Sequence, residues 1–317
     1  MCCSVSFARN GQCGGSPCEI KYRKRVVACS GPMLCFYRVP TDNDRGGGDL
    51  SFAKRWKESG LDRLRLIAQA QLSVDSVRTS TGDPALRVTS IYELSADGSP
   101  KEPRIKVHAS FTIGCVTELL CEYRLHVSEG FPCLARVGTL TRIPRKYCQT
   151  AEWLGCGPHE SYPDRKSSAP IGRYSMCVSD LDPAYIVPAE SAGRASCYYF
   201  ALYDDRKREG FLAAPALGSK LAQVSAREYS IESLEKANHQ HELPQLHPGD
   251  GFVYVHVDEA HHGLGGDDSW TPSTLHEFRV KPGKYHFAQH IAALSDNDGQ
   301  LDPDAAYREA LAREAGR

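Results

Sequence analysis

The sequence carries no excess of charge of either sign. Lys and Arg number 38 against 39 Asp and Glu, so the formal net charge is −1. Proteins that bind a nucleic-acid backbone or an acidic lipid surface usually carry a clear basic excess. The near balance therefore argues against nucleic acid and against a membrane as partners.

Long apolar runs are also missing. No run approaches the roughly 20 residues that a helix needs to cross a bilayer, and residues 1–10 lack the apolar core of a secretory signal. With 317 residues and 41% hydrophobic content, the chain is long enough to bury a large core. We expect a soluble protein of the cytoplasm.

Paired CxxC motifs are absent although cysteine is plentiful. There are 13 cysteines, an odd number. The spacing of Cys13, Cys18, Cys29 and Cys35 fits no zinc ribbon or finger. In a chain of this size we expect reduced, buried or idle thiols rather than a framework of disulfides, and we assign no metal to them.

Strict alternation of apolar and polar residues is the dominant pattern that is present. A period of two places every second side chain on one face of a half-buried strand. The clearest runs cover residues 86–94, 105–113 and 119–127, and the last two are separated by only a short turn. The pattern predicts an antiparallel meander in an all-β fold.

A closing hairpin is predicted near the end of the chain. Apolar residues alternate over 278–280 and 285–287, and Pro282 and Gly283 between them supply turn geometry. A further strand is expected over 252–257.

Helical signals are few and short. We expect surface helices over 51–59, which stops at Gly60, and over 230–237, which begins with a capping Ser. No repeated strand-then-helix rhythm is present, so a (β/α)8 barrel is not expected. Residues after about 294 form a polar tail that can end in a helix.

The first of three unusual segments covers residues 36–49. Here a strand ends in Asp42, Asn43 and Asp44, and three glycines follow from Gly46. The short acceptors can fold back on the backbone as Asx turns, and glycine permits a mobile loop. An ordinary structured turn and a binding loop both remain open from the residues alone.

The second segment, residues 153–168, is dense in polar groups held between prolines and glycines. Adjacent side chains on an extended segment point to opposite faces, so His159 and Glu160 do not form an acid and base pair. The alternative is a hydrogen-bonded structural loop. Its candidate residues are His159, Glu160, Tyr162, Asp164 and Arg165.

The third segment, residues 261–272, places Asp267 and Asp268 just before Trp270. A sugar presents an apolar face that stacks on an aromatic ring while its hydroxyls seek carboxylates, so this set suits carbohydrate binding. A buried Trp that anchors a loop is the alternative. The pair His261 and His262, like His239 and His241, lacks an indicated third metal ligand nearby.

Together the three segments resemble one known family. Residues 38–47 read R-V-P-T-D-N-D-R-G-G, 157–166 read G-P-H-E-S-Y-P-D-R-K, and 265–272 contain G-G-D-D-S-W followed by Pro272. These resemble, in order and spacing, signatures of the carboxy-terminal domain or small chain of glycoside hydrolase family 2 β-galactosidases. The likeness covers about residues 20–292.

The resemblance implies a fold and a division of the chain. It implies a large antiparallel supersandwich similar to galactose mutarotases, with a few short surface helices. We expect a Cys-rich lead over 1–20 that matches poorly, the supersandwich over 21–293, and the polar tail over 294–317.

The resemblance also implies a role. Trp270, with Asp267 and Asp268, would help to form the sugar site, beside a mobile loop that comprises Asp42, Asn43, Asp44, Gly46 and Gly47. The nucleophile and the acid/base carboxylate of the family lie on a barrel part missing from this chain, so no catalytic residue is assigned here and the chain alone is expected to be inactive. Retaining hydrolysis needs two carboxyl groups roughly 5 to 5.5 Å apart.

Partners and cofactors follow from the same resemblance. The expected partners are the barrel-bearing catalytic part, in the same gene or as a separate chain, and a terminal β-D-galactoside such as lactose, within an oligomeric full enzyme. Magnesium and sodium ions would be bound largely by the absent part, so no cofactor is assigned to this chain.

Two departures and two alternatives remain. Residues 188–194 differ from the usual family segment, and Tyr198 and Tyr199 stand where many members carry Arg-Trp. One alternative is an autonomous aldose 1-epimerase, which needs a His and a Glu facing one sugar, such as His256 or His262 with Glu277. The other is a non-catalytic carbohydrate-binding module.

Overall fold

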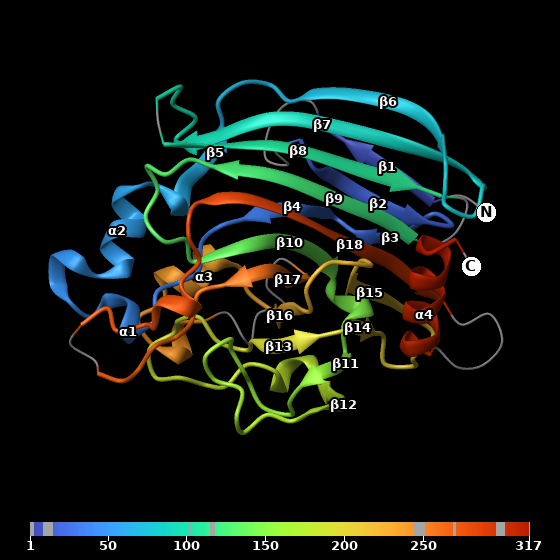
Figure 1. Cartoon of the computed structure of the whole chain (residues 1–317). Helices are drawn as coiled ribbons and strands as arrows, with labels where there is room; N and C mark the ends of the chain where they lie inside the picture. The colour runs from blue at the N-terminus through green and yellow to red at the C-terminus, as the bar shows by residue number, and fades with distance from the viewer. Residues whose placement is uncertain are drawn as a thin grey trace.

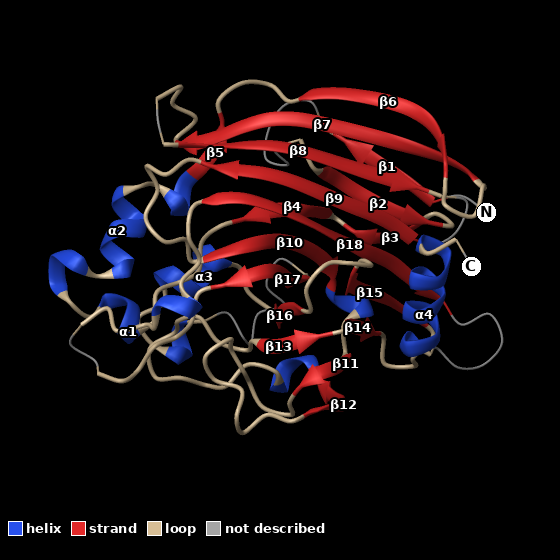
Figure 2. Cartoon of the chain, in the orientation of Figure 1, coloured by secondary structure: helices blue, strands red, loops and turns tan. Residues whose placement is uncertain are grey.

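A computed structural model describes residues 3–8, 15–101, 103–114, 118–243, 251–268, 271–295 and 302–316. Antiparallel strands dominate these ranges, and the helices lie at the margins of the sheets (Figure 1, Figure 2). None of the described helices has the length and apolar character that crossing a bilayer would require. The expected all-β class is confirmed.

The largest sheet has ten strands. In spatial order it contains β12 (Ile171–Cys177), β11 (Thr150–Cys156), β14 (Tyr199–Tyr203), β15 (Glu209–Pro215), β18 (Gly283–Ser295), β9 (Glu118–Val127), β8 (Arg104–Ile113), β7 (Pro84–Ala96) and β5 (Leu64–Leu66), with β6 (Gln71–Arg78) also paired to β7. β7, β8 and β9 pair consecutively and antiparallel. The predicted meander is therefore confirmed.

A second sheet has five strands and a third has three. The five-stranded sheet contains, in order, β13 (Arg194–Cys197), β16 (Ala222–Arg227), β17 (Phe252–His261), β10 (Arg136–Pro144) and β4 (Ser30–Cys35). The three-stranded sheet contains β1 (Cys3–Phe7), β2 (Pro17–Tyr22) and β3 (Arg25–Ala28). The strand expected from residue 252 is confirmed and extends four residues beyond the predicted end, to His261.

The two large sheets share one hydrophobic core. On β9, Cys121 and Tyr123 are fully buried, whereas the alternate residues Glu122 and Arg124 face away from the core. The Tyr123 hydroxyl donates to the Pro32 carbonyl on β4 at 3.1 Å, which joins the sheets. The period of two therefore sorts the large sheet into a buried inner face and an open outer face.

Helices occupy the edges of this sandwich. The α-helices are α1 (Asp42–Arg45), α2 (Phe52–Glu58), α3 (Ile231–Lys236) and α4 (Pro303–Glu314), and the 3-10 helices are η1 (Gly48–Leu50), η2 (Leu61–Arg63), η3 (Arg145–Tyr147), η4 (Val178–Asp180), η5 (Gln240–Glu242) and η6 (His276–Phe278). Ser51 caps α2 and Ser230 caps α3 through their side-chain oxygens. Both predicted surface helices are confirmed.

The ends of the chain also contain regular structure. Phe7 at the end of β1 packs on Phe111 of β8, with ring centroids 5.3 Å apart. In the expected polar tail, α4 begins at Pro303 after the capping residue Asp302, and Tyr307 packs near Tyr199. The division of the chain into a lead, a supersandwich and a tail stays a prediction.

The predicted closing hairpin is wrong. Phe278 ends η6, and Val280 forms an isolated bridge with Leu134. β18 begins at Gly283 and pairs with β9 on one side and β15 on the other. Because the first half of β18 pairs with β9 instead of with residues 278–280, no local hairpin forms, and the turn residues lead the chain into the middle of the sheet.

Candidate functional site

The three unusual segments meet at the carboxyl end of β17, and Arg38 joins two of them. This side chain is fully buried and forms a two-point ion pair with Asp44, with Nη2 2.7 Å from Oδ1 and Nε 3.1 Å from Oδ2. It also donates to the carbonyls of His262 at 2.5 Å and Gly263 at 3.0 Å. A single guanidinium therefore fixes the first segment against the third.

Asp44 has a second role at the start of α1. Its carboxylate accepts from the backbone N–H of Thr41 at 2.9 Å, while the Thr41 hydroxyl accepts from the N–H of Asp44. This reciprocal arrangement is a capping box. The short acceptors therefore start one helical turn instead of the expected Asx turns, because Asp44 is held in place by Arg38.

The loop of residues 42–48, called the glycine loop below, contacts the third segment directly. The Asn43 side-chain amide donates to the Leu264 carbonyl at 3.1 Å. Gly47 has φ of 90°, and a Cβ at this position would lie 2.6 Å from Cδ of Pro272. Asp42 is exposed and lies 3.3 Å from Arg45, and Gly46 ends α1. The mobility expected of this loop stays a prediction.

The second segment reaches the third through Asp164. Its carboxylate accepts from the backbone N–H groups of Leu264 at 3.0 Å and Gly265 at 2.8 Å. A Cβ on Gly263 would lie 2.5 Å from Asp164 Oδ2, so the glycine allows this close approach. All three segments therefore converge on residues 262–266.

The remaining residues of the second segment form a network around Glu160. This nearly buried carboxylate pairs with Arg165 at 3.0 Å and accepts from the Tyr185 hydroxyl and from the N–H of Ala192. His159 instead is exposed and lies 3.1 Å from the Ser168 hydroxyl. His159 and Glu160 thus have separate partners, as their adjacency predicts.

Tyr162 connects this network to a buried charged cluster that the sequence analysis did not identify. The Tyr162 hydroxyl accepts from the N–H of Gly193 at 3.2 Å and lies 3.4 Å from Glu190 Oε1. Glu190 in turn pairs with Arg136 at 2.5 Å and Arg227 at 3.0 Å. Burial favours the neutral acid, but these two guanidinium groups hold the pKa of Glu190 below its usual value.

Asp258 is the second carboxyl of the cluster, and its environment is different. It lies 3.4 Å from Arg136, but burial outweighs the effect of this guanidinium and raises the pKa of Asp258 to about 7. Burial also keeps the pKa of His256 and of His261 well below the usual range. The cluster therefore holds one firmly ionised carboxylate, Glu190, beside neutral imidazoles.

This cluster lies directly behind the converging segments. The His261 ring contacts both Arg38 and Arg136, with nitrogen–nitrogen distances of 3.4 Å in each case. Its members come from β10, β16, β17 and the 182–193 connection, and no local motif links them. Only the register of three strands could have revealed it.

The sugar-binding candidates of the third segment are partly described. Asp267 is exposed. The Asp268 carboxylate accepts from the N–H of Thr271 at 2.8 Å and from its hydroxyl at 2.9 Å. Trp270 lies outside the described residues, so its expected place in a sugar site stays a prediction.

The candidate metal ligands are not gathered into one site. His262 packs on Phe52 and Trp56, with the Phe52 ring centroid 4.5 Å away, and His239 stacks on His241 at 5.6 Å. Within the described ranges, no group of three or more His, Cys, Asp or Glu side chains is arranged to hold a metal ion. The ten described cysteines are all free.

The acid and base pair considered for an epimerase is not assembled. His256 and His262 are buried in separate surroundings, whereas Glu277 is exposed on η6. An epimerase needs both groups to face one sugar. The described residues therefore do not provide the arrangement that this alternative requires.

Comparison with known families agrees with the three motifs. The model of the family described as "Beta galactosidase small chain" matches residues 7–291. The chain belongs to the β-galactosidase small-chain family. The match begins earlier than the motifs alone indicated, so it includes part of the lead that was expected to match poorly.

The small-chain homologues are β-galactosidases of much greater length. This chain is 29% identical over 259 residues to a β-galactosidase of Pseudoalteromonas haloplanktis, covering 80% of this chain and 23% of the relative. It is 30% identical over 270 residues to one from Alteromonas mediterranea, covering 81% and 24%. The chain thus spans about a quarter of the length of these relatives.

Among solved structures, a putative aldose 1-epimerase from Escherichia coli K12 is similar at a TM-score of 0.44 and 10% identity, covering 89% of this chain and 94% of that one. Similarity at this level carries no argument about activity. The small-chain assignment rests on the family match and on the three motifs.

Proposed function

We propose that this small chain completes the galactoside site of a β-galactosidase whose catalytic carboxylates lie on another part. The observation that carries the proposal is the convergence of all three family motifs on residues 262–266. Buried Arg38 and half-buried Asp164 hold that junction from two sides. A rigid junction of this kind can present a loop to a sugar with little loss of conformational entropy on binding.

The proposed substrate is a terminal β-D-galactoside such as lactose. Asp267 is exposed beside the junction and offers a carboxylate to sugar hydroxyls, and the carboxylate of Asp268 accepts from the Thr271 N–H. We propose that Trp270 stacks on the sugar part that leaves. Hydrolysis itself would use the two carboxyl groups of the partner, and we propose that magnesium and sodium ions are also held largely there.

Exposed apolar side chains near the junction support docking of a catalytic part. Tyr185, whose hydroxyl reaches Glu160, is followed by Ile186, which is 81% exposed, and by Val187. Leu50 after the glycine loop is 70% exposed, and Leu275 is 54% exposed. Large apolar side chains grouped around a functional region are typical of an interface.

The test is hydrolysis of a chromogenic β-galactoside by the purified chain, alone and mixed with the barrel-bearing part of a β-galactosidase. We expect activity only in the mixture. Trp270→Ala should lower it about tenfold through lost stacking, and Asp267→Asn by a similar factor through a weakened hydrogen bond. Asp75→Asn, an exposed change on β6, is the matched control and should leave activity unchanged.

Three results would contradict the proposal. Activity of the chain alone would require catalytic residues in it. Mixtures that form a complex in analytical ultracentrifugation but stay inactive would show that this chain does not complete the sugar site. A failure to form any complex would show that the barrel-bearing part is not a partner of this chain. Galactose binding by the isolated chain would then favour a carbohydrate-binding module.

A further inference from the structure

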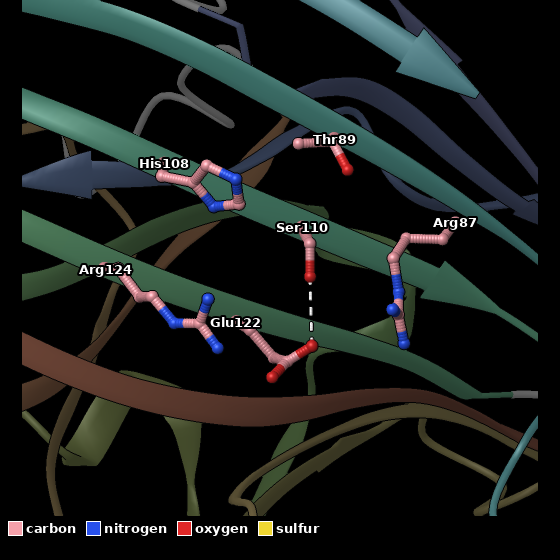
Figure 3. A pocket seen from close by; sticks show the side chains of 6 residues that line it. All are labelled: Arg87, Thr89, His108, Ser110, Glu122 and Arg124. Atoms are coloured by element: carbon pink, nitrogen blue, oxygen red, sulfur yellow. Dashed lines mark hydrogen bonds between the residues drawn. The ribbon is translucent and has the colours of Figure 1, made fainter. Parts of the chain in front are cut away.

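The outer face of the ten-stranded sheet contains a polar hollow far from the three motifs in the fold. Its volume is about 230 Å³. Figure 3 shows the side chains that line it, all on three neighbouring strands: Arg87 and Thr89 on β7, His108 and Ser110 on β8, and Glu122 and Arg124 on β9. Because the alternate residues of these strands form the shared core, this face points away from the five-stranded sheet.

Strand register places these groups as direct neighbours. Ser110 stands opposite both Thr89 and Glu122, and His108 stands opposite Arg124. The Ser110 hydroxyl donates to the Glu122 carboxylate at 3.0 Å. In Figure 3 that carboxylate lies between the guanidinium groups of Arg87 and Arg124.

Both guanidinium groups keep most of their hydrogen-bonding capacity. Arg87 donates through Nε to the Thr112 hydroxyl at 3.3 Å. Neither Arg87 nor Arg124 forms a salt bridge within the described part of the chain. Hydroxyl groups, one carboxylate and two planar cations therefore face the same hollow.

The hollow continues along the sheet into a larger groove that is lined by both basic and apolar side chains. A second hollow of about 560 Å³ shares His108 and Arg124 with the first. Its outward-facing side chains beyond these two include Lys106, His126, Lys284 and His286. Both hollows together reach the usual size of small-ligand sites, about 300–1,000 Å³.

The ladder register concentrates these basic groups. His108, Arg124 and His286 stand in one row across three strands, and Lys106, His126 and Lys284 stand in the next. The nearby Glu93 does not balance them, because it pairs with Arg104 at 3.0 Å. The cations Lys106, Arg124 and Lys284 therefore lie within two adjacent rows, where together they can attract an anion.

We propose that this groove binds a hexose that carries a negatively charged group, either a carboxylate or a phosphate ester. Arg87 and Arg124 provide the planar donors that suit such an anion. Thr89, Ser110 and Glu122 provide the donors and the acceptor that sugar hydroxyls require. A site for a bare anion would gain nothing from a carboxylate, so Glu122, beside the hydroxyls of Thr89 and Ser110, favours an anion that also carries hydroxyl groups, as a sugar does. The inference does not rest on the proposed galactosidase role.

Isothermal titration calorimetry with the full chain tests the proposal. The probes are galacturonate and galactose 6-phosphate, which distinguish the two anionic groups, with galactose and inorganic phosphate as references. We expect one of the two anionic sugars to bind more tightly than both references. Arg124→Gln should weaken that binding about tenfold by removing a charge-assisted hydrogen bond. Arg308→Gln, on exposed α4, is the matched control.

Glu122→Gln separates a sugar site from a general anion surface. If Glu122 accepts from sugar hydroxyls, the variant binds the anionic sugar more weakly and inorganic phosphate more strongly, because one negative charge is gone. If the variant binds both more strongly, or if phosphate binds the wild type as well as either sugar does, the proposal is wrong. No measurable binding of either anionic sugar would also overturn it.

Discussion

The two large sheets of this small chain differ in how far their charged side chains are buried. Behind the motif junction, the five-stranded sheet buries Arg136, Arg227, Glu190 and Asp258 at 6% exposure or less. On the outer face of the ten-stranded sheet, the side chains of Lys106, Arg124 and Lys284 are exposed to solvent. Buried charges need partners in fixed geometry, whereas exposed charges remain available to a ligand. The comparison assigns structural support to the first region and binding capacity to the second.

The buried cluster supports the site because its members are continuous with it. Glu190 lies in the same connection as Ala192, whose N–H binds Glu160 of the second motif. His261 ends β17 and contacts Arg38, which holds the first motif. A change in the cluster is therefore expected to displace the motif junction as well as lower stability.

The largest expected effect is that of Glu190→Ala. Removal of this carboxylate leaves Arg227 buried without its counter-charge and Arg136 with only Asp258, which costs about 3–5 kcal/mol. Urea unfolding at neutral pH measures the loss. Glu122→Ala on the outer face is the control and should cost less than about 1 kcal/mol. Equal losses of stability in the two variants would show that the two sheets do not differ in how much their charged groups contribute to the fold.

The next effect is a pH dependence that Asp258→Asn should remove. Its pKa is about 7 in the folded chain, against 3.8 as the ordinary value. The folded state therefore retains a proton that the unfolded chain releases, so this group stabilises the fold at low pH and the contribution is lost as pH rises from about 4 to about 7. Each unit of pKa difference corresponds to about 1.4 kcal/mol.

The measurement compares the free energies of unfolding of wild type and Asp258→Asn at about pH 5 and about pH 8. The wild type should lose stability relative to the variant between the two pH values. The neighbouring Glu190, His256 and His261 are present in both proteins, so their contributions largely cancel. The opposite trend would show that Arg136 keeps Asp258 ionised.

A smaller effect is expected of Gly47→Ala, which sharpens the comparison by testing how tightly the motif junction is packed. The residue has a positive φ of 90°, and the new Cβ would meet Pro272 at 2.6 Å. We expect a loss of about 1–3 kcal/mol and weaker complementation of a catalytic part.

Gly48→Ala provides the matched control for that change. Gly48 also has a positive φ, of 56°, but its Cβ would meet nothing within 4 Å. It should therefore show only the backbone cost, about 1 kcal/mol. If both variants behave alike in thermal unfolding, the contact between the glycine loop and Pro272 does not constrain the junction.

The smallest effect is that of Arg124→Gln on the outer face. Its exposed side chain should change the free energy of unfolding by less than about 0.5 kcal/mol, which corresponds to a shift of only about 1–2 °C in Tm. Thermal unfolding measures it and serves as the folding control for the binding experiment. A loss above about 1 kcal/mol would show that Arg124 has a structural partner.

Local patterns predicted much of the fold but not its connections. The alternation over 105–113 and 119–127 identified β8 and β9, and Ser51 marked the start of α2, because strand period and helix capping act within a few residues. The hairpin expected at 278–287 failed for the opposite reason. Pairing of β18 with β9 and β15 depends on residues far along the chain, which turn chemistry alone does not reveal.

The site shows the same division. The three motifs were recognised as short runs of residues, and the structure then placed them around 262–266. The buried cluster was missed because Arg136, Glu190 and Asp258 belong to separate elements with no shared pattern. The outer groove was missed as well, although His108 and Arg124 occupy the outward positions of strands that the alternation had identified.

What the sequence by itself determined is which side chains of β8 and β9 face the core, where two surface helices begin, and to which family the motifs point. These properties follow from spacing along a few residues. Only the tertiary structure decided that Arg38 and Asp164 bind the same loop, that Glu190 is ionised while Asp258 has a pKa of about 7, and that six basic groups share two rows of one sheet. The physical reason is that strand register and burial set those distances and environments, and both depend on contacts between residues far apart in the chain.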